Sequence, residues 1–284
     1  MNQLDTLCIT NMSRNQMDIA VNWSNLEGWN PGMYDADTFY DTDPSGYFMA
    51  CVNGQPVGCI SAVAYDDSFG FIGFFIVLPQ YRGRRIGIEL GAHALAYLGG
   101  RCIGIDGVES KVKQYGSHGF TFAYNNIRYE GQSTMFNFLH SAIVPVSEIP
   151  FEDIVAYDTR FFPVARPLFL SMWLQQPHSV ALVMLGNNGL TGYGVIRPCQ
   201  RGYKIAPLFA DDKHIAEALF LSLISQVPPN SYFYIDIPQV NDDAVELVSM
   251  YSLKPVFRTA RMYYNAVPDI PTENIFGVTS FELG

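Results

Sequence analysis

Apolar and polar positions alternate along much of the first half of the chain, which predicts short strands separated by turns and a few helices. The clearest local signal is Asn53-Gly54 between two apolar runs, a turn that joins the strands of a hairpin. The predicted strands cover residues 4–10, 47–52, 55–64, 69–78, 102–108 and 120–130. The predicted helices cover residues 14–26, after the N-cap Ser13, and residues 35–40, 86–98 and 110–118. This order predicts a mixed α/β arrangement with a mainly antiparallel front part.

The second half repeats this order after a connector that contains Pro145 and Pro150. The predicted strands cover residues 180–185, 191–198, 203–208, 232–237 and 256–264, and the predicted helices cover 158–173, with interruptions at two prolines, 211–226 and 242–251. We therefore predict two domains in tandem, residues 1–137 and 151–284, joined by a linker at 138–150. Each domain is expected to hold a mixed, largely antiparallel sheet flanked by helices. A chance likeness between two α/β domains remains the alternative to a repeat.

Composition narrows the class of protein. The chain has 284 residues, 49% of them hydrophobic and 15% charged, which favours a packed globular core. Its formal net charge of -10, without a long stripe of Lys and Arg, argues against binding to nucleic acid. The five cysteines form no Cys-x-x-Cys pair, and no His or Cys grouping suggests a metal site. No signal peptide and no membrane-spanning run is evident, so a cytoplasmic protein with reduced thiols is expected.

The segment from Val77 to Gly87 carries the most chemistry. An apolar strand ends at Pro79, a loop rich in arginine and glycine follows, and an amphipathic helix begins near Ile86. The free backbone N–H groups and the positive end of the dipole at such a helix N-terminus form an anion site. The side chains of Arg82, Arg84 and Arg85 add charge suited to phosphate. The spacing fits neither a P-loop nor a Rossmann glycine motif.

The same segment resembles the cofactor-binding motif Q/R-x-x-G-x-G/A of the GNAT acyltransferases. Gln80 and Gly83 agree with this motif, and Arg85 departs from it where Gly or Ala is usual. Downstream, Tyr115 to Phe120 resembles the Tyr-x-x-x-Gly-Phe element of the same family. The resemblance covers about residues 4–132 as a catalytic-type domain, and the second half only as a degenerate copy without the phosphate loop.

The resemblance implies acetyl-CoA as the cofactor. Its pyrophosphate would lie on the loop and on the start of the helix, at Arg82, Gly83, Arg84, Arg85, Ile86 and Gly87. Its pantetheine arm would add to the end of the strand at Ile76 and Val77 like an extra strand, and the Val77 amide would donate to the thioester carbonyl. We expect the Arg85 side chain to swing out and pair with the phosphate.

The catalytic residues are less well marked by sequence. Tyr115 is expected to act as the general acid that protonates the departing thiolate. The strand at residues 69–77 lacks the acid that many relatives keep, which leaves Glu27, Asp35, Asp66 and Glu109 as candidate bases, with Glu27 preferred. The run from Glu27 to Gly32, followed by Asp35, is similar to an element of one tandem GNAT subgroup, which also ends like residues 276–284.

That element implies an acceptor site made by Glu27, Trp29, Asn30 and Asp35, in which a carboxylate beside Trp29 would hold an ammonium group. A plain helix end with Trp29 in the core is the alternative. The expected reaction is acetyl transfer from acetyl-CoA to a primary amine of a small molecule or peptide, by direct attack in a ternary complex. A non-catalytic acyl-CoA-binding or interaction module is the rival function. The second half would complete the pocket or stabilise the fold, and the sequence indicates no oligomeric state.

Overall fold

The computed structural model describes residues 6–134, 138 and 140–284. Leu4 and Asp5, at the start of the first predicted strand, lie outside the described residues, as do 135–137 and 139 at the predicted domain boundary. The helices are α1 (Arg14–Leu26), α2 (Asp35–Thr42), α3 (Ile86–Leu98), α4 (Val112–Ser117), α5 (Phe151–Asp158), α6 (Pro167–Trp173), α7 (Lys213–Ile224) and α8 (Asp242–Met250). Within these ranges, none of the helices combines the length and the apolar character that crossing a membrane requires.

The strands of both halves join in one sheet. They are β1 (Leu7–Asn11), β2 (Tyr47–Val52), β3 (Gln55–Ala64), β4 (Phe69–Val77), β5 (Cys102–Val108), β6 (Thr121–Gln132), β7 (Ile143–Pro145), β8 (Val180–Gly186), β9 (Gly189–Pro198), β10 (Tyr203–Ala210), β11 (Tyr232–Pro238), β12 (Lys254–Tyr264) and β13 (Ile275–Gly277). In the described part of the chain the spatial order is β1-β2-β3-β4-β5-β12-β6-β11-β10-β9-β8-β7, with β13 added to β10. Only the pairs β4–β5 and β10–β11 are parallel there.

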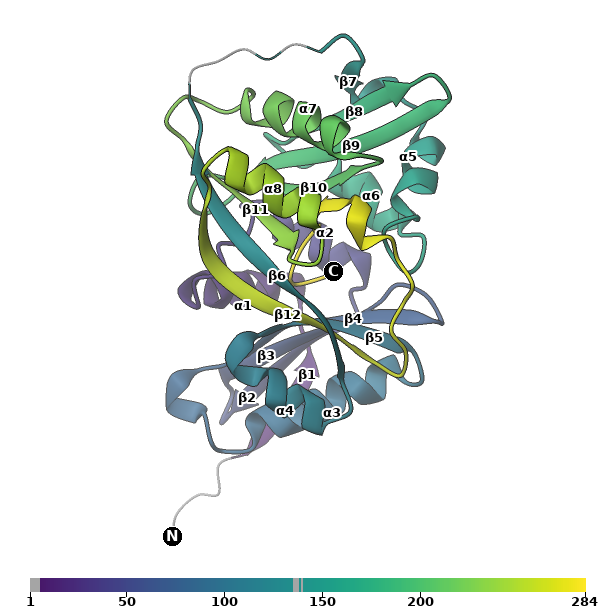
Figure 1. Ribbon diagram of the computed structural model, residues 1–284. Coiled ribbons are helices and arrows are strands. Elements are labelled where there is room, and N and C mark those ends of the chain that lie inside the picture. The colour runs from purple at the N-terminus through teal and green to yellow at the C-terminus, as the bar shows by residue number, and fades with distance from the viewer. Residues whose placement is uncertain (1–5, 135–137, 139) are drawn as a thin grey trace.

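The predicted fold class is confirmed: the sheet is mixed, mainly antiparallel and flanked by helices, and the order of elements repeats. The first half forms the lower part of the molecule, with α3 and α4 beside its sheet, and the second half forms the upper part with α7 and α8 (Figure 1). Five predicted elements, α1, β2, β3, α3 and β5, have the observed bounds.

The two halves exchange strands β6 and β12, which the sequence does not predict. β12 of the second half lies between β5 and β6 of the first, and β6 lies between β12 and β11. The long diagonal strands β6 and β12 run side by side through the middle of the molecule (Figure 1). The predicted boundary at residue 137 therefore separates two stretches of chain but does not divide the sheet.

A shared apolar core also joins the halves. It contains Phe39 of α2 and Trp173 of α6, whose rings stack with centroids 5.9 Å apart. Both side chains are fully buried. Burial of large aromatic side chains is among the strongest stabilising contributions in a fold, so these helices hold the halves together behind the sheet.

One predicted helix is placed wrongly. The sequence pattern suggested a helix from Asp158 to Trp173, but α5 ends at Asp158 and a new helix, α6, begins at Pro167. Pro150, interpreted as a breaker, is in fact the N-cap of α5. Proline is compatible with a helix start because the first N–H groups of a helix have no intrahelical acceptor.

Candidate active site

A cavity opens where β4 and β5 separate. The two strands pair from Phe69 to Ile72 of β4, and β4 then bulges, since its register with β3 shifts between Gly73 and Ile76. Within the bulge Phe74 has a positive φ of 45°. A bulge bends a strand and turns its side chains, and here it leads β4 away from β5. The cavity between them has a volume of about 540 Å³.

Val77 turns its backbone polar groups toward this cavity. The Leu78 amide donates to the Val57 carbonyl at 2.9 Å, so the preceding residue pair, Val77 with Gly58, is not hydrogen-bonded across β3 and β4. The Val77 carbonyl instead accepts from Arg82 Nε at 2.8 Å. Because β4 has no strand partner on that side beyond Ile72, the Val77 amide faces the opening. It is placed to donate to a carbonyl group in the cavity.

The arginine-rich loop forms the mouth of the cavity. Gly83 and Arg85 have positive φ values of 79° and 64°, and Arg85 is the N-cap of α3. The Arg85 carbonyl accepts from the Ile88 and Glu89 amides, which starts the helix. The amides of Ile86 and Gly87 thus belong to the first turn, whose N–H groups have no acceptor within the helix. These groups and the helix dipole favour an anion.

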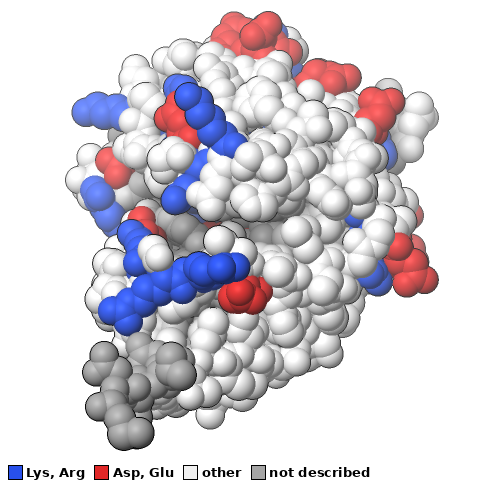
Figure 2. Space-filling model, turned by 90° about the horizontal axis from the view of Figure 1, so that it is seen from below, with Lys and Arg blue, Asp and Glu red and all other residues white. Residues whose placement is uncertain are grey.

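All but one of the predicted cofactor residues line the cavity: Ile76, Val77, Arg82, Gly83, Arg85, Ile86 and Gly87 do so. Arg84 is not among the lining residues, and its guanidinium lies over the Tyr81 ring, 5.2 Å from the centroid. On the face of the molecule seen from below, Lys and Arg side chains gather on one side next to a hollow in the surface (Figure 2).

Glu27 lies across the mouth from the loop. It follows the last residue of α1, and its carboxylate pairs with Arg82 at 2.6 Å. Both residues line the cavity, and both remain partly exposed. The carboxylate predicted as the base is therefore engaged by an arginine of the predicted cofactor loop.

Tyr115 of α4 lines the cavity from the side of β5. Its ring packs on Gly107, where a Cβ atom would lie 2.6 Å from ring atom Cε2, so glycine is required for this approach. Burial raises the pKa of Tyr115 to about 12. The phenol therefore stays protonated at neutral pH and can act as a proton donor.

The predicted acceptor residues are only partly brought together. Trp29 lines the cavity, but Asn30 and Asp35 do not. Asn30 has a positive φ of 51°, and its side-chain oxygen accepts from the Arg201 amide of the second half at 2.8 Å. The backbone there turns the amide side chain away from the cavity, which corrects the expectation that Asn30 contacts the acceptor.

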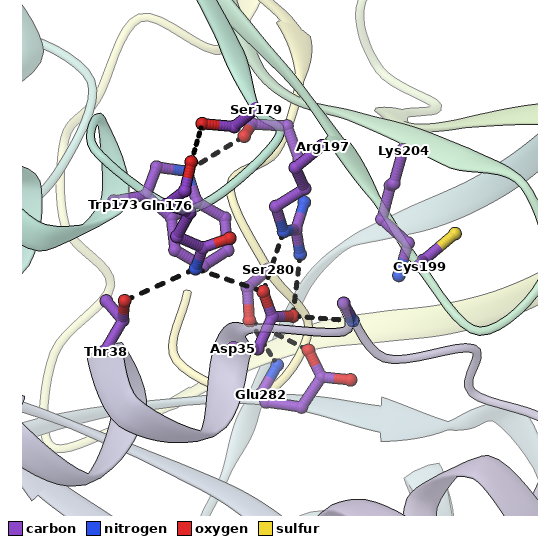
Figure 3. Close-up of polar contacts among 12 residues, drawn as sticks. Asp35, Thr38, Trp173, Gln176, Ser179, Arg197, Cys199, Lys204, Ser280 and Glu282 are labelled. Atoms are coloured by element: carbon purple, nitrogen blue, oxygen red, sulfur yellow. Dashed lines mark hydrogen bonds and ion pairs between the residues drawn. The ribbon is translucent and has the colours of Figure 1, made fainter.

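Asp35 is also corrected. It is 1% exposed and accepts two hydrogen bonds from Arg197 of β9, at 2.8 and 3.0 Å (Figure 3). Burial disfavours its charged form, but the attraction of Arg197 outweighs burial and lowers the pKa of Asp35. This carboxylate joins the two halves instead of binding a ligand. Arg197 of the second half has the same structural role.

Several cavity residues were missed by the sequence analysis. They are Asp106 of β5, Phe257 and Thr259 of β12, and Phe281 and Glu282 near the C-terminal end of the chain. Asp106 accepts from Arg261 at 2.7 and 3.0 Å and from Asn126 at 2.8 Å, and burial raises its pKa. Four of the five belong to the second half: Phe257 and Thr259 reach the cavity because β12 inserts beside β5, and Phe281 and Glu282 because the C-terminal segment packs on β4 at Gly73. The resemblance of residues 276–284 to the end of a tandem GNAT subgroup includes Phe281 and Glu282, but it did not indicate that they line the cavity.

Comparison with known proteins gives two family matches. A model described as "Acetyltransferase (GNAT) family" matches residues 15–120, and one described as "Acetyltransferase (GNAT) domain" matches residues 154–277. The chain is 25% identical over 272 residues to a holothin acyltransferase from Pseudoalteromonas sp. (strain SANK 73390), covering 96% of this chain and 92% of that protein.

Solved structures share the fold. A crystal structure from Pyrococcus horikoshii superposes with a TM-score of 0.84 at 22% identity, covering 100% of this chain and 99% of that one. A tandem GNAT protein from the clavulanic acid biosynthesis pathway superposes with a TM-score of 0.63 at 14% identity, covering 93% and 100%. The two matched segments, one in each half, show that this chain belongs to the GNAT acyltransferase family as a tandem of two GNAT domains.

Proposed function

We propose that this protein is an acetyltransferase that moves the acetyl group of acetyl-CoA to a primary amine of a small molecule or peptide. The observation that carries this proposal is the cavity at the fork of β4 and β5, the place after Ile72 where the two strands separate. It is bordered by the inward amide of Val77, the open N-terminus of α3 and the hydroxyl-bearing ring of Tyr115.

The loop and helix start suit a diphosphate. Gly83 has open space where a side chain would begin, so a ligand can lie against the backbone there. The first-turn amides at Ile86 and Gly87 would donate to phosphate oxygens, with Arg85 adding charge at the rim. Acetyl-CoA would supply an acetyl group already activated as a thioester.

The chain's own groups would then act at the acyl end. The Val77 amide would donate to the thioester carbonyl oxygen and stabilise the negative charge that develops on it. Tyr115 would give its proton to the departing sulfur. Holding donor and acceptor together in one cavity lets the amine attack directly, with no acyl group carried on the protein.

The acceptor would enter from the side of the second half. Trp29, Phe257 and Phe281 line the cavity and offer apolar surface to the body of an amine. The similarity to a holothin acyltransferase across both halves supports acyl transfer by a chain of this arrangement.

The test is to mix the protein with acetyl-CoA and a panel of primary amines and to follow thiol release together with the acetylated product by mass spectrometry. We expect amine-dependent thiol release with matching product. Tight binding of acetyl-CoA without thiol release across the panel would instead support an acyl-CoA-binding module. Thiol release from a longer acyl-CoA but not from acetyl-CoA would show that acetyl-CoA is not the acyl donor.

A further inference from the structure

We propose that Glu282 is the base that takes the proton from the acceptor amine, and that the amine therefore lies against the cavity wall formed by the C-terminal segment. This inference rests on the proposed acetyl transfer. It names a residue far from the loop in sequence but on the wall of the same cavity.

The position of Glu282 follows from a close backbone approach. β4 carries no Asp or Glu, so a carboxylate at its fork has to come from elsewhere in the chain. At Gly73, just before the bulge, a Cβ atom would lie 2.0 Å from the Glu282 carbonyl oxygen. Only glycine lets the C-terminal segment lie on β4 at this point. The segment thereby brings a carboxylate to the strand that lacks one.

Three carboxylates line the cavity, and their partners differ. Glu27 is paired with Arg82, and Asp106 is held by Arg261 and Asn126. Glu282 is 4% exposed, and its Oε1 is a buried oxygen without a hydrogen-bond partner in the described structure. Buried polar atoms nearly always have a partner, so an unsatisfied one at a cavity wall indicates a missing donor. An amine N–H would supply that donor.

The carboxylate is held in a fixed orientation. Ser280 Oγ donates to Glu282 Oε2 at 2.8 Å and accepts from the Glu282 amide at 2.9 Å (Figure 3). This leaves Oε1 as the available oxygen. Thr259 Oγ1 is also buried without a partner and belongs to the same cavity wall. Within the described residues, both oxygens are therefore acceptors without a donor on the wall of this cavity.

The charges around Glu282 come from three strands. Arg128 of β6, Arg197 of β9 and Lys204 of β10 interact with it electrostatically. Arg128 is paired with Asp236 and Arg197 with Asp35, whereas Lys204 Nζ donates to the Asn30 carbonyl. The cluster is neutral when Glu282 is a carboxylate. A purely structural counter-charge is thus the alternative role that the experiment has to separate.

The proposed step balances. The amine nitrogen forms a bond to the carbonyl carbon and the carbon–sulfur bond breaks. One proton passes from the nitrogen to Glu282, and the Tyr115 proton passes to the sulfur. Water later returns a proton to Tyr115 and removes one from Glu282, so neither residue is changed over a cycle.

The experiment compares Glu282→Gln, Glu282→Asp and the control Glu273→Gln, an exposed acid of the same C-terminal segment. The probe is benzylamine, since aromatic side chains line the cavity. We expect Glu282→Gln to lower kcat about 100-fold and to abolish the acidic limb of the pH profile, with the KM for acetyl-CoA little changed. The control should match the wild type.

Glu282→Asp keeps the charge but withdraws it by one methylene, so it separates the two roles. A base predicts a large loss of kcat with an unchanged Tm, whereas a counter-charge predicts that both stay the same. Wild-type kcat in either Glu282 variant, or a lower kcat with an unaltered pH profile, would overturn the assignment while leaving the acetyl transfer standing. No turnover of any amine by the wild type would overturn the proposed function itself.

Discussion

The two halves use the same fork of parallel strands in opposite ways. In the first half β4 and β5 part after Ile72, and the space between them is the cavity. In the second half β10 and β11 pair only from Tyr203 to Ile205, but β13 then hydrogen-bonds to β10 at Leu208 and Phe209. A strand of protein fills the position that the first half leaves for a ligand.

The helices that follow the two forks differ in whether their first amides are already bound by a side chain of the protein. α3 follows Arg85 and presents its first amides to the cavity. α7 follows Asp212, whose carboxylate accepts from the His214 and Ile215 amides at 2.8 and 2.9 Å. The second half therefore carries its own anion where the first half is open to one. The duplicated architecture is kept in both halves, but β13 and Asp212 close in the second half the fork and helix start that stay open in the first.

The largest expected effect concerns two equivalent ion pairs of the sheet. Asp106 is the fifth residue of β5 and Asp236 the fifth of β11, and each faces an arginine of an exchanged strand. Asp236→Asn leaves Arg128 buried without its counter-ion, so we expect a loss of about 3–5 kcal/mol in the free energy of unfolding, measured by urea. Asp106→Asn should cost less, because burial has already raised the pKa of Asp106. Equal losses of unfolding free energy in the two variants would show that the two ion pairs do not differ in their contribution to stability.

The pH dependence of stability should also distinguish Asp236 from Asp106. Burial by itself disfavours the charged form of Asp236, but the attraction of Arg128 and the neighbouring cations outweighs burial. The pKa of Asp236 in the folded protein is therefore lowered. Its stabilisation is present above the unfolded-state pKa of about 4 and is lost as pH falls through the lower folded value. The stability gap between wild type and Asp236→Asn should therefore narrow in acid. The folded-state pKa of Asp106 is raised, so protonation of Asp106 favours the folded state. The difference in stability between wild type and Asp106→Asn should therefore not narrow in acid.

Two tyrosines test which half is catalytic. Tyr115 lies in α4 of the first half and Tyr251 directly follows α8 of the second, and burial raises the pKa of each to about 12. Tyr251 donates to Glu217 at 2.6 Å, whereas Tyr115 borders the cavity. Tyr115→Phe should lower kcat about 100-fold with acetyl-CoA binding retained. Tyr251→Phe should leave kcat within about twofold. Unchanged turnover in Tyr115→Phe would remove that residue from the mechanism.

A smaller effect is expected from Arg85→Asp, which gives the N-cap of α3 the negative charge that Asp212 gives the N-cap of α7. Asp tolerates a left-handed backbone, so Arg85→Asp should fold, with its carboxylate at the cofactor mouth. We expect the Kd for acetyl-CoA to rise about 10- to 100-fold by calorimetry, the equivalent of one charge-assisted hydrogen bond. Lys254→Asp on the exposed surface makes the same change in net charge and should not affect Kd.

The smallest effect is the reverse change in the second half. Asp212→Ala removes the cap of α7 and should cost about 1 kcal/mol of stability by thermal or urea unfolding. Acetyl-CoA should bind with the wild-type Kd and one site per chain. A second binding site in this variant would show that only the cap, and not β13, closes the second fork.

Local signals were enough to predict much of this architecture and part of the site. Asn53-Gly54 fixes the hairpin of β2 and β3, and the loop residues and Tyr115 do meet in one cavity. Local patterns do not say which segments meet across 150 or more residues of chain, so Thr259 of β12 and Glu282 of the C-terminal segment were missed. The resemblance to a tandem GNAT subgroup also placed Asp35 at the acceptor site, because nothing local to Asp35 in sequence indicates its distant partner Arg197.

The exchange of β6 and β12 has a consequence for how the protein is made. The contact between Asp106 and Arg261 spans 155 positions of sequence. During synthesis the edge of β5 must wait for β12, and long-range strand pairing is slow. A nascent chain that has left the ribosome only as far as the first half holds the phosphate loop but no finished pocket. The edge of β5 stays unpaired until β12 is made, and the cavity is complete only once the C-terminal segment has folded.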